Sequence, residues 1–341
     1  MHNYHSFALI KTKLIIQMSE QREEQLIIHE LAERKKMSIS DFRRGEVLGT
    51  GTFSHVQQVF YHDIPFALKV MSIRKMVELK QTEHVRWERE VLQELNHPFI
   101  IRMHRCFHDS TNLYMLLEYV QGGELFSRLR KLKRFSLSQT LFYASQVLLS
   151  VEHMHQMDVI YRDLKPENIL IDKEGYIKVV DFGFAKKVKH SRTYTLCGTP
   201  DYLAPELIRG EQYGKSVDIW SFGILIYEMM VGHPPFISSK PLLTYRKILS
   251  ADVRYPSHLS SSCRDVLQRL LNPSSRDRIC CSAGNMEELK QHPFFASVSF
   301  RRVLSREEES PWKPSLMTDS DTQHYQDGEK CVEKAEKCVN R

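Results

Sequence analysis

The chain has 341 residues, of which 42% are hydrophobic and 26% are charged, and this balance is typical of a globular protein. At about 150 residues per domain, the length corresponds to two folding units or one large bilobal unit, and a wholly disordered or fibrous protein is excluded. The net charge of +6 is too small to indicate a nucleic-acid surface, and no apolar run approaches the roughly 20 residues of a membrane span.

The first 40 residues are polar and rich in charge, and we interpret them as a helical extension and not as a domain. An apolar stripe at Leu26, Ile27, His29 and Leu31 predicts the helix.

Short runs rich in β-branched and aromatic residues follow between residues 41 and 120, and they predict a small β-rich lobe. One helical segment interrupts them, because Val85, Glu88, Leu92 and Leu95 recur at helical spacing. This spacing puts the Glu88 carboxylate on the apolar face, where it needs a partner. The predicted strands cover residues 47–48, 54–61, 66–70 and 113–120.

Long helical patterns alternate with loops over residues 121–295, and they predict a larger, mainly helical lobe. Residues 218–231 are apolar nearly all round, as expected of a buried helix. The two lobes together predict an α+β fold with one domain over residues 41–295. Residues 296–341 are charged and contain scattered prolines, which is typical of a partly disordered tail.

A glycine-rich run and a lysine in the small lobe could together form a phosphate site. Gly49 and Gly51 lie between two predicted strands, where glycine lets backbone N–H groups approach a phosphate. Such a hairpin is also common as a plain turn. Lys69 lies in an apolar strand, either as a surface lysine or as an ammonium paired with Glu88.

Three further motifs decide between these interpretations. Residues 161–168 read Tyr-Arg-Asp-Leu-Lys-Pro-Glu-Asn, residues 181–183 read Asp-Phe-Gly, and residues 204–206 read Ala-Pro-Glu. In this order and at these separations the motifs resemble the eukaryotic protein kinase family, and within it the catalytic subunits of cAMP-dependent kinases. The resemblance covers about residues 41–314 and implies a bilobal protein kinase fold with ATP in the cleft.

The resemblance implies a role for each matched residue in phosphoryl transfer, which depends on positioning and charge neutralisation. Asp163 would accept the proton of the substrate hydroxyl, and Lys165 would contact the γ-phosphate. Asn168 and Asp181 would hold Mg²⁺, because a small hard cation prefers oxygen ligands. The other ATP-binding positions are Leu48, Gly49, Gly51, Val56, Ala67, Lys69 held by Glu88, Glu118, Val120, Glu124 and Leu170.

The resemblance also implies how the enzyme is activated and which substrates it selects. Thr195 matches the activating phosphorylation site, with Arg162, Lys186 and His84 placed to receive the phosphate. Three acidic residues match positions that bind arginines before the acceptor, and three apolar residues match the pocket for the residue after it. Protein substrates with Arg-Arg-x-Ser-hydrophobic motifs are therefore expected. The three acidic residues are Glu124, Glu167 and Glu228, and the three apolar residues are Leu196, Pro200 and Leu203.

One serine of the chain itself fits this substrate pattern in part. Ser38 follows Lys35-Lys36-Met37 and precedes Ile39. Because lysine pairs less well than arginine with carboxylates, Ser38 is interpreted as a suboptimal self-phosphorylation site.

The resemblance implies a cAMP-binding regulatory subunit as a partner, because Tyr245 matches a residue that docks this subunit in the resembled kinases. Tyr194 stands where tryptophan is usual and buries less area on docking. Ser54 replaces the third glycine of the phosphate loop, and the sequence has no terminal Phe-x-x-Phe. These two departures favour the rival hypothesis of a kinase-shaped binding module without turnover, whereas the complete catalytic set opposes it.

The cysteines and the N-terminal residues bear on location. The seven cysteines form no CxxC pair and are odd in number, so neither a zinc site nor a complete disulfide framework is expected. Residues 1–18 lack the small-residue cleavage site of a secretory signal. A cytoplasmic or nuclear location is therefore expected.

Overall fold

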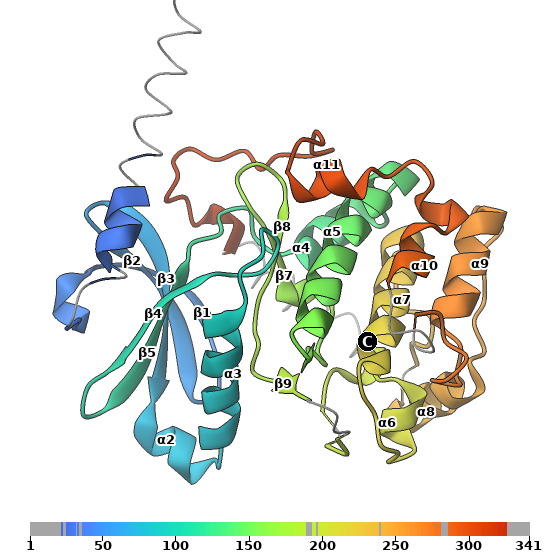
Figure 1. Cartoon of the computed structure of the whole chain (residues 1–341), viewed down its shortest axis with the longest axis horizontal. Coiled ribbons are helices and arrows are strands. Elements are labelled where there is room, and N and C mark those ends of the chain that lie inside the picture. The colour runs from blue at the N-terminus through green and yellow to red at the C-terminus, as the bar shows by residue number, and fades with distance from the viewer. Residues whose placement is uncertain are drawn as a thin grey trace, which may run out of the picture. The chain divides into compact units, whose positions relative to one another are not determined.

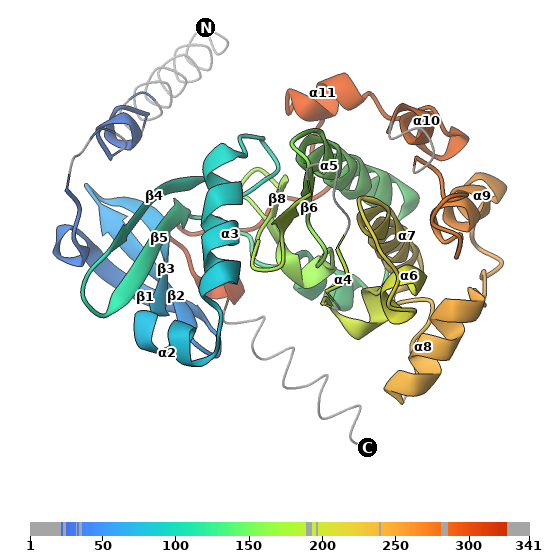
Figure 2. The same ribbon diagram turned by 60° about the horizontal axis from the view of Figure 1, so that its bottom comes forward.

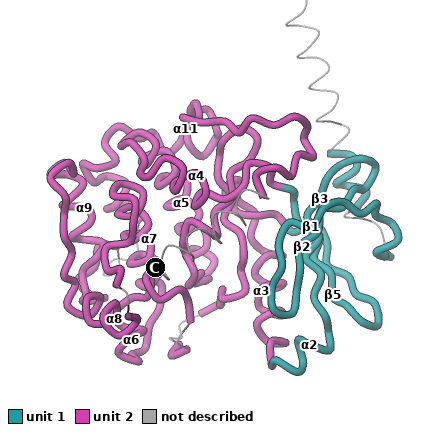
Figure 3. Tube along the Cα trace, turned by 180° about the vertical axis from the view of Figure 1, so that it is seen from behind, with its two compact units in different colours: residues 1–79, 103–119 teal, residues 80–102, 120–341 magenta. Residues whose placement is uncertain are grey.

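The computed structural model describes residue 22, residues 25–31, residue 33, and residues 36–325 except 189–192, 196, 239 and 281–285. The chain divides into two compact units, which Figure 3 draws in different colours. Unit 1 contains the residues up to Leu79 and the segment Met103–Tyr119, and unit 2 contains Lys80–Arg102 and the residues from Val120 onward. The segment 80–102 therefore groups with unit 2, although it lies between strands of unit 1 in the sequence.

Unit 1 is built on a five-stranded antiparallel sheet with the strand order β1-β2-β3-β5-β4 (Figure 1). All four strands predicted from the sequence are present, whereas β4 and the short helix α2 were not predicted. No residue of β4 is fully buried, and its sequence shows no alternation of apolar and polar residues that would predict a strand. The elements are η1 (Ile39–Asp41), β1 (Arg43–Thr50), β2 (Ser54–Tyr61), β3 (Ile64–Ser72), α2 (Ile73–Glu78), β4 (Met103–His108) and β5 (Asn112–Glu118).

The N-terminal extension contributes to the core of unit 1. Residues 25–31 are helical in the described part, and Leu31 is fully buried in one cluster with Tyr61 and Leu116 of the sheet. The Tyr61 hydroxyl donates a hydrogen bond to Glu30 Oε1 at 2.9 Å. The extension is therefore a helix packed on the sheet, as far as the described residues extend.

The buried face of this helix differs from the predicted stripe. Leu26 is 66% exposed and His29 is exposed, so both face away from the sheet. Ile27, which belongs to the predicted stripe, and Ile28, which does not, pack against the core cluster. With Leu31 they share one side of a helix of about 3.6 residues per turn, which Leu26 and His29 do not.

Unit 2 is mainly helical, as predicted (Figure 2). The predicted segment around Glu88 forms α3 (Thr82–Glu94), and Val85, Glu88 and Leu92 are buried on it. Two small sheets pair β6 (Val159–Ile160) with β9 (Lys186–Lys187), and β7 (Ile169–Ile171) with β8 (Ile177–Val179). The other elements are α4 (Leu125–Leu132), α5 (Leu137–Gln156), η2 (Pro166–Asn168), η3 (Pro200–Tyr202), α6 (Pro205–Ile208), α7 (Ser216–Val231), α8 (Pro241–Ser250), α9 (Ser261–Leu270), α10 (Glu287–Lys290), η4 (Pro293–Phe295) and α11 (Phe300–Leu304).

Helices α5 and α7 lie side by side at the centre of unit 2. Helix α7 is buried along nearly its whole length, including its two charged residues Asp218 and Glu228. A Cβ added at Gly223 would lie 2.8 Å from Leu270 Cβ, so glycine lets α7 approach α9 closely. Within the described residues, no helix is both long enough and apolar enough to span a membrane.

The described part of the C-terminal tail lies along unit 2 and holds the turn between β7 and β8. Arg306 NH2 lies 2.5 Å from Asp172 Oδ2, and the Ser310 hydroxyl is 3.1 Å from the Gly175 carbonyl oxygen. Gly175 has φ +86, and a Cβ there would lie 2.1 Å from the carbonyl oxygen of Trp312. The tail is therefore packed on unit 2 as far as residue 325, and residues 326–341 lie outside the described residues.

Candidate active site

The loop after β6 gathers polar side chains around the buried Asp163. Lys165 Nζ lies 2.9 Å from Asp163 Oδ2, and the Asn168 amide nitrogen donates to the same oxygen at 2.8 Å. The Thr199 hydroxyl donates to Asp163 Oδ1 at 3.0 Å, and Lys165 Nζ donates to Thr199 Oγ1 at 2.9 Å. Both oxygens of the carboxylate are therefore fixed in orientation, and the three residues predicted to be catalytic are brought together.

The backbone of this loop is held by Asp218, a fully buried carboxylate on α7. Its Oδ1 accepts from the Arg162 N–H at 2.8 Å, and its Oδ2 accepts from the Tyr161 N–H at 3.0 Å and lies 2.8 Å from His155 Nε2. Arg162 has φ +70, a left-handed conformation that costs a non-glycine residue about 1–3 kcal/mol. Asp218 holds the loop in this conformation, which the isolated segment would not favour.

Asn168 and Asp181, the predicted Mg²⁺ ligands, flank two paired strands, since Asn168 ends η2 just before β7 and Asp181 follows β8. The Val180 N–H donates to the Asn168 carbonyl oxygen at 2.9 Å, which places Asp181 next to Asn168. Because the Asn168 side-chain nitrogen donates to Asp163, its amide oxygen is the atom that can face a cation. A carboxylate and an amide oxygen suit Mg²⁺. Phe182, fully buried beside Asp181, packs edge-on against the Tyr161 ring at 5.2 Å.

In unit 1, the predicted nucleotide-binding residues lie on adjacent strands. The β1–β2 hairpin closes where the Gly51 N–H donates to the Ser54 carbonyl oxygen at 2.7 Å. Lys69 on β3 is in register with Val56 on β2. Lys69 belongs to unit 1 and Glu88 to unit 2, so the ion pair predicted between them stays a prediction. The remaining residues of this set are Leu48 and Gly49 on β1, Ala67 on β3, Glu118 at the end of β5, and Val120, Glu124 and Leu170 in unit 2.

The three predicted arginine-binding acids lie in unit 2. Burial raises the pKa of Glu124 to about 7, and the charge of Glu167 adds to the effect. Burial also raises the pKa of Glu167, whose Oε2 atom is buried without a hydrogen-bond partner among the described residues. Glu228 is 1% exposed, lies 2.7 Å from Arg130 NH2 and accepts from the Tyr202 hydroxyl, and burial raises its pKa too. A cation brought close to these carboxyls would favour their ionised form and lower the raised pKa values.

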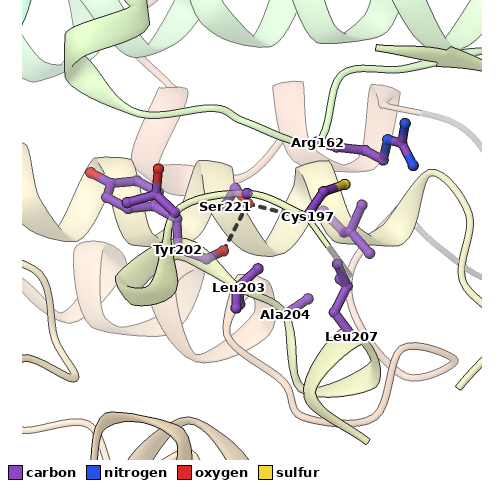
Figure 4. Close-up of a pocket in the computed structure, with 10 residues that line it drawn as sticks. Arg162, Cys197, Tyr202, Leu203, Ala204, Leu207 and Ser221 are labelled. Atoms are coloured by element: carbon purple, nitrogen blue, oxygen red, sulfur yellow. Dashed lines mark hydrogen bonds between the residues drawn. The ribbon is translucent and has the colours of Figure 1, made fainter. Parts of the chain in front are cut away.

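A small pocket beside the catalytic loop is lined by Arg162, Gly198 and Leu203, among others (Figure 4). Gly198 has φ +109, and a Cβ there would lie 2.8 Å from the Arg162 carbonyl oxygen, so only glycine fits. Of the predicted apolar substrate residues, Leu203 lines this pocket and Pro200 is at the start of η3. Leu196 lies outside the described residues.

Thr195, the predicted phosphorylation site, is exposed. Its carbonyl oxygen accepts from the Tyr213 hydroxyl at 2.5 Å. The Arg162 guanidinium in turn lies 3.1 Å from that hydroxyl. The Tyr213 hydroxyl therefore links the Arg162 guanidinium to the backbone of Thr195 in the unmodified protein.

The other two predicted phosphate-receiving residues have local partners. Lys186 Nζ donates to Thr193 Oγ1 at 3.1 Å and lies 5.2 Å from the centre of the Trp87 ring, a cation–π contact that joins β9 to α3. The His84 ring nitrogen Nδ1 lies 2.8 Å from Gln81 Oε1. The sequence alone did not indicate a role for Trp87.

Glu206 and Arg278 form a buried ion pair. Two guanidinium nitrogens of Arg278 lie 2.8 and 2.9 Å from the two carboxylate oxygens of Glu206. The Ser216 hydroxyl adds a hydrogen bond of 3.0 Å to Glu206. Burial opposes ionisation of Glu206, but the hydrogen bonds and charge of Arg278 outweigh it, so the pKa of Glu206 is lowered. The ion pair fixes α6 to the loop after α9.

Thr199 and Asp218 are the contacts to Asp163 and its loop that sequence reasoning missed. Thr199 lies within the motif that ends in Ala-Pro-Glu, yet nothing in its spacing points to Asp163. Asp218 offered a signal, because an acidic residue in an otherwise apolar helix needs buried donors.

Comparison with known families agrees with this geometry. Residues 42–295 match the protein kinase domain. The chain therefore belongs to the protein kinase family, whose members use ATP and Mg²⁺.

Three similar relatives are cAMP-dependent kinases or resemble them. The chain is 46% identical over 283 residues to cAMP-dependent protein kinase type 3 of Saccharomyces cerevisiae, covering 82% of this chain and 71% of the yeast protein. It is 45% identical over 291 residues to cAMP-dependent protein kinase catalytic subunit PRKX of Homo sapiens, covering 85% and 81% of the two chains. It is also 41% identical over 310 residues to a cAMP-dependent protein kinase catalytic subunit-like protein of Caenorhabditis elegans, covering 90% and 78%. The chain is a serine/threonine protein kinase similar to these catalytic subunits.

Proposed function

We propose that this kinase transfers the γ-phosphate of ATP to serine and threonine hydroxyls in Arg-Arg-x-Ser-hydrophobic segments. The observation that carries the proposal is the Asp163 carboxylate, held by Lys165, Asn168 and Thr199. A hydroxyl brought to this carboxylate can pass its proton to Asp163, while the Lys165 ammonium faces the negative charge of the transferred group. A binding module without turnover would not need this arrangement.

The remaining chemistry is charge neutralisation. The Asn168 amide oxygen and the Asp181 carboxylate would hold Mg²⁺, which supplies neutralising charge to the phosphates of ATP. Lys69 would orient the α- and β-phosphates, with Glu88 as its counter-charge. A radiolabelled transfer assay with Mg-ATP and an Arg-Arg-x-Ser-hydrophobic peptide tests the proposal, and an absence of transfer would favour the binding-module hypothesis.

The preference for arginine rests on Glu124, Glu167 and Glu228. Burial raises the pKa of all three carboxyls, so a guanidinium brought to them would favour their ionised form. Glu167 Oε2 has no hydrogen-bond partner among the described residues, whereas Glu228 already lies 2.7 Å from Arg130 NH2. A guanidinium can satisfy two carboxylate oxygens at once, so arginine should be preferred to lysine. An apolar residue after the acceptor would lie near Leu203.

We expect Glu167→Gln to raise KM for the Arg-Arg-x-Ser peptide by one to two orders of magnitude, about 1.4 to 2.7 kcal/mol. Glu228→Gln should have a similar effect, because each change removes a carboxylate that pairs with guanidinium. Steady-state kinetics with varied peptide give the values, and KM for ATP should barely change. A peptide array that favours proline or acidic residues around the acceptor would contradict the assignment.

The same kinetics should depend on pH. The pKa of Glu124 is raised to about 7 and a bound guanidinium favours the ionised form, so peptide affinity is complete above pH 7 and weakens below it. We expect peptide KM to rise up to about tenfold from pH 8 to pH 6. In Glu124→Gln, KM should be higher at pH 8 and this rise smaller, and an unchanged profile in that variant would assign the titration to another group.

We further propose that phosphorylation of Thr195 activates the enzyme. Thr195 is exposed, and the Tyr213 hydroxyl links its carbonyl oxygen to the Arg162 guanidinium. A phosphate adds nearly two negative charges and several strong acceptors, which can draw in Arg162 and Lys186 and order the loop.

We expect Thr195→Ala to lower kcat/KM for the peptide by about tenfold or more, because no phosphate can then order the loop. Mass spectrometry of the active wild-type enzyme should find Thr195 modified. Phosphatase treatment should reduce wild-type activity to the level of the variant and leave the variant unchanged. Full activity of Thr195→Ala would refute the proposal.

A cAMP-binding regulatory subunit is the proposed partner. Exposed apolar side chains support this proposal, since Leu242 on α8 is 63% exposed and Tyr194 is 61% exposed. A pull-down with a regulatory subunit, released by cAMP, is the test, and no binding at micromolar concentration would indicate a cAMP-independent kinase. Among the described residues, Cys197 and Cys263 form no disulfide, which supports the proposed cytoplasmic or nuclear location.

A further inference from the structure

The segment between the N-terminal helix and β1 presents a serine in an unusual setting. Ser38 is followed by the short helix η1 and has an extended backbone, with φ −132 and ψ 157. It forms a capping box with Asp41, in which the Ser38 N–H donates to Asp41 Oδ2 at 2.7 Å, and this hydrogen bond is exposed. On either side, Met37 and Ile39 pack against the core cluster of unit 1.

The residues around Ser38 match the chemistry of the substrate-binding acids. Lys35 and Lys36 lie three and two residues before Ser38, and Ile39 follows it. Two cations at these positions suit Glu124, Glu167 and Glu228. Ile39 suits the apolar pocket near Leu203 of the second copy and, being only partly buried, would leave the core cluster to enter it. Lysine lacks the two-pronged geometry of arginine, so this segment should react more slowly than an Arg-Arg peptide.

We propose that Ser38 is phosphorylated by a second copy of this kinase and that the phosphate loosens the N-terminal helix from the sheet of unit 1. The inference rests on the proposed function. In the reaction, a bond forms between Ser38 Oγ and the γ-phosphorus of ATP, and the bond from that phosphorus to the β-phosphate oxygen breaks to leave ADP. The hydroxyl proton passes to Asp163 of the copy that acts as enzyme, and then to solvent.

The phosphate would weaken the packing through charge repulsion. It brings nearly two negative charges to a residue whose own N–H is bonded to the Asp41 carboxylate. Arg43, a nearby cation in the sequence, already lies 3.2 Å from Asp63 and stacks on the Phe60 ring at 3.9 Å. Loss of the capping box would free Met37 and Ile39, which pack with Leu31 of the helix against the sheet.

Two other serines provide comparisons within the same chain. Ser40 is also exposed, but Asp41 follows it and no basic residue lies two or three positions before it. Ser136 follows Lys133-Arg134-Phe135, yet Phe135 is 3% exposed and its N–H donates to the Met229 carbonyl oxygen at 2.8 Å. Ser38 therefore combines the basic residues with a segment that lies at the surface.

The test uses the full-length wild-type kinase with Mg-ATP and a ¹⁵N-labelled Asp163→Asn chain as substrate. The label separates substrate from enzyme, and the tryptic peptide 37–43 contains both Ser38 and Ser40, which fragmentation distinguishes. We expect phosphate on Ser38 of the labelled chain, absent when that chain also carries Ser38→Ala and retained when it carries Ser40→Ala. Amide exchange of residues 25–31 should become about tenfold faster in the phosphorylated Asp163→Asn chain than in the same chain incubated without ATP.

A parallel assay with the Arg-Arg-x-Ser-hydrophobic peptide separates the two possible failures. If the peptide is phosphorylated but Ser38 is not, or if Ser40 is modified instead, the inference is overturned and the proposed function stands. If neither the peptide nor Ser38 is phosphorylated, the proposed function itself fails. Phosphate on Ser38 without faster exchange in residues 25–31 would overturn the loosening of the helix.

Discussion

Asp163→Asn is expected to leave a folded protein whose kcat is lower by about three orders of magnitude or more, because the carboxylate acts on the substrate hydroxyl in the transition state. The amide can take the place of the carboxylate with little disturbance. Its nitrogen can donate to Thr199 from the position of Oδ1, and its oxygen can accept from Lys165 and Asn168. Single-turnover phosphate transfer to the peptide measures the change.

Nucleotide binding provides the control for this variant. Asp163→Asn should keep the thermal stabilisation by Mg-ATP, whereas Asp181→Ala should lose much of it, because Asp181 is a proposed metal ligand and Asp163 is not. Lys69→Met should also lower turnover by orders of magnitude. Near-normal turnover in Asp163→Asn would show that the proton acceptor has been assigned wrongly.

Arg278→Leu is expected to destabilise the protein by about 3–5 kcal/mol, because it leaves a buried charge without its partner. The Glu206 carboxylate, which is 1% exposed, loses two guanidinium hydrogen bonds in this variant. Equilibrium unfolding in urea measures the loss, provided that the transition follows two-state behaviour.

Two further variants separate a buried charge from lost packing. Arg302→Ala removes the cation of an ion pair with Glu308 whose side chains are 56% and 35% exposed, and it should change stability little. The double variant Glu206→Leu with Arg278→Leu should be more stable than Arg278→Leu alone, because no unpaired charge remains. A double variant as unstable as Arg278→Leu would show that lost packing, and not the unpaired charge of Glu206, causes the loss of stability.

The sequence predicted the grouping of those proposed catalytic residues that lie close together in the chain. Asp163, Lys165 and Asn168 fall within six residues, so their grouping follows from one loop. Thr199 and Asp218 reach the same loop from 36 and 56 residues away in the chain, and only the folded packing of η3 and α7 brings them there. Local spacing does not contain such contacts, although a lone acid in an apolar helix is a usable signal.

The elements of the fold were also predicted only where the local sequence pattern is clear. Strand β2 formed over its predicted residues because its apolar and β-branched side chains suit a sheet, whereas β4 has no fully buried residue and was missed. The N-terminal helix was predicted, but Leu26 and His29 were placed on the wrong face because the period of a short stripe is ambiguous. Its inward face is defined by the sheet that it covers.

Leu31 and Arg306 have a practical consequence for recombinant production. The kinase-domain match spans residues 42–295, yet Leu31 is buried in the core before it and Arg306 binds Asp172 after it. A fragment limited to residues 42–295 would lack Leu31, which leaves a cavity in the core of unit 1, and Arg306, which pairs with Asp172 in the β7–β8 turn. Expression vectors for crystallography or inhibitor screening should therefore begin ahead of residue 25 and run past residue 325.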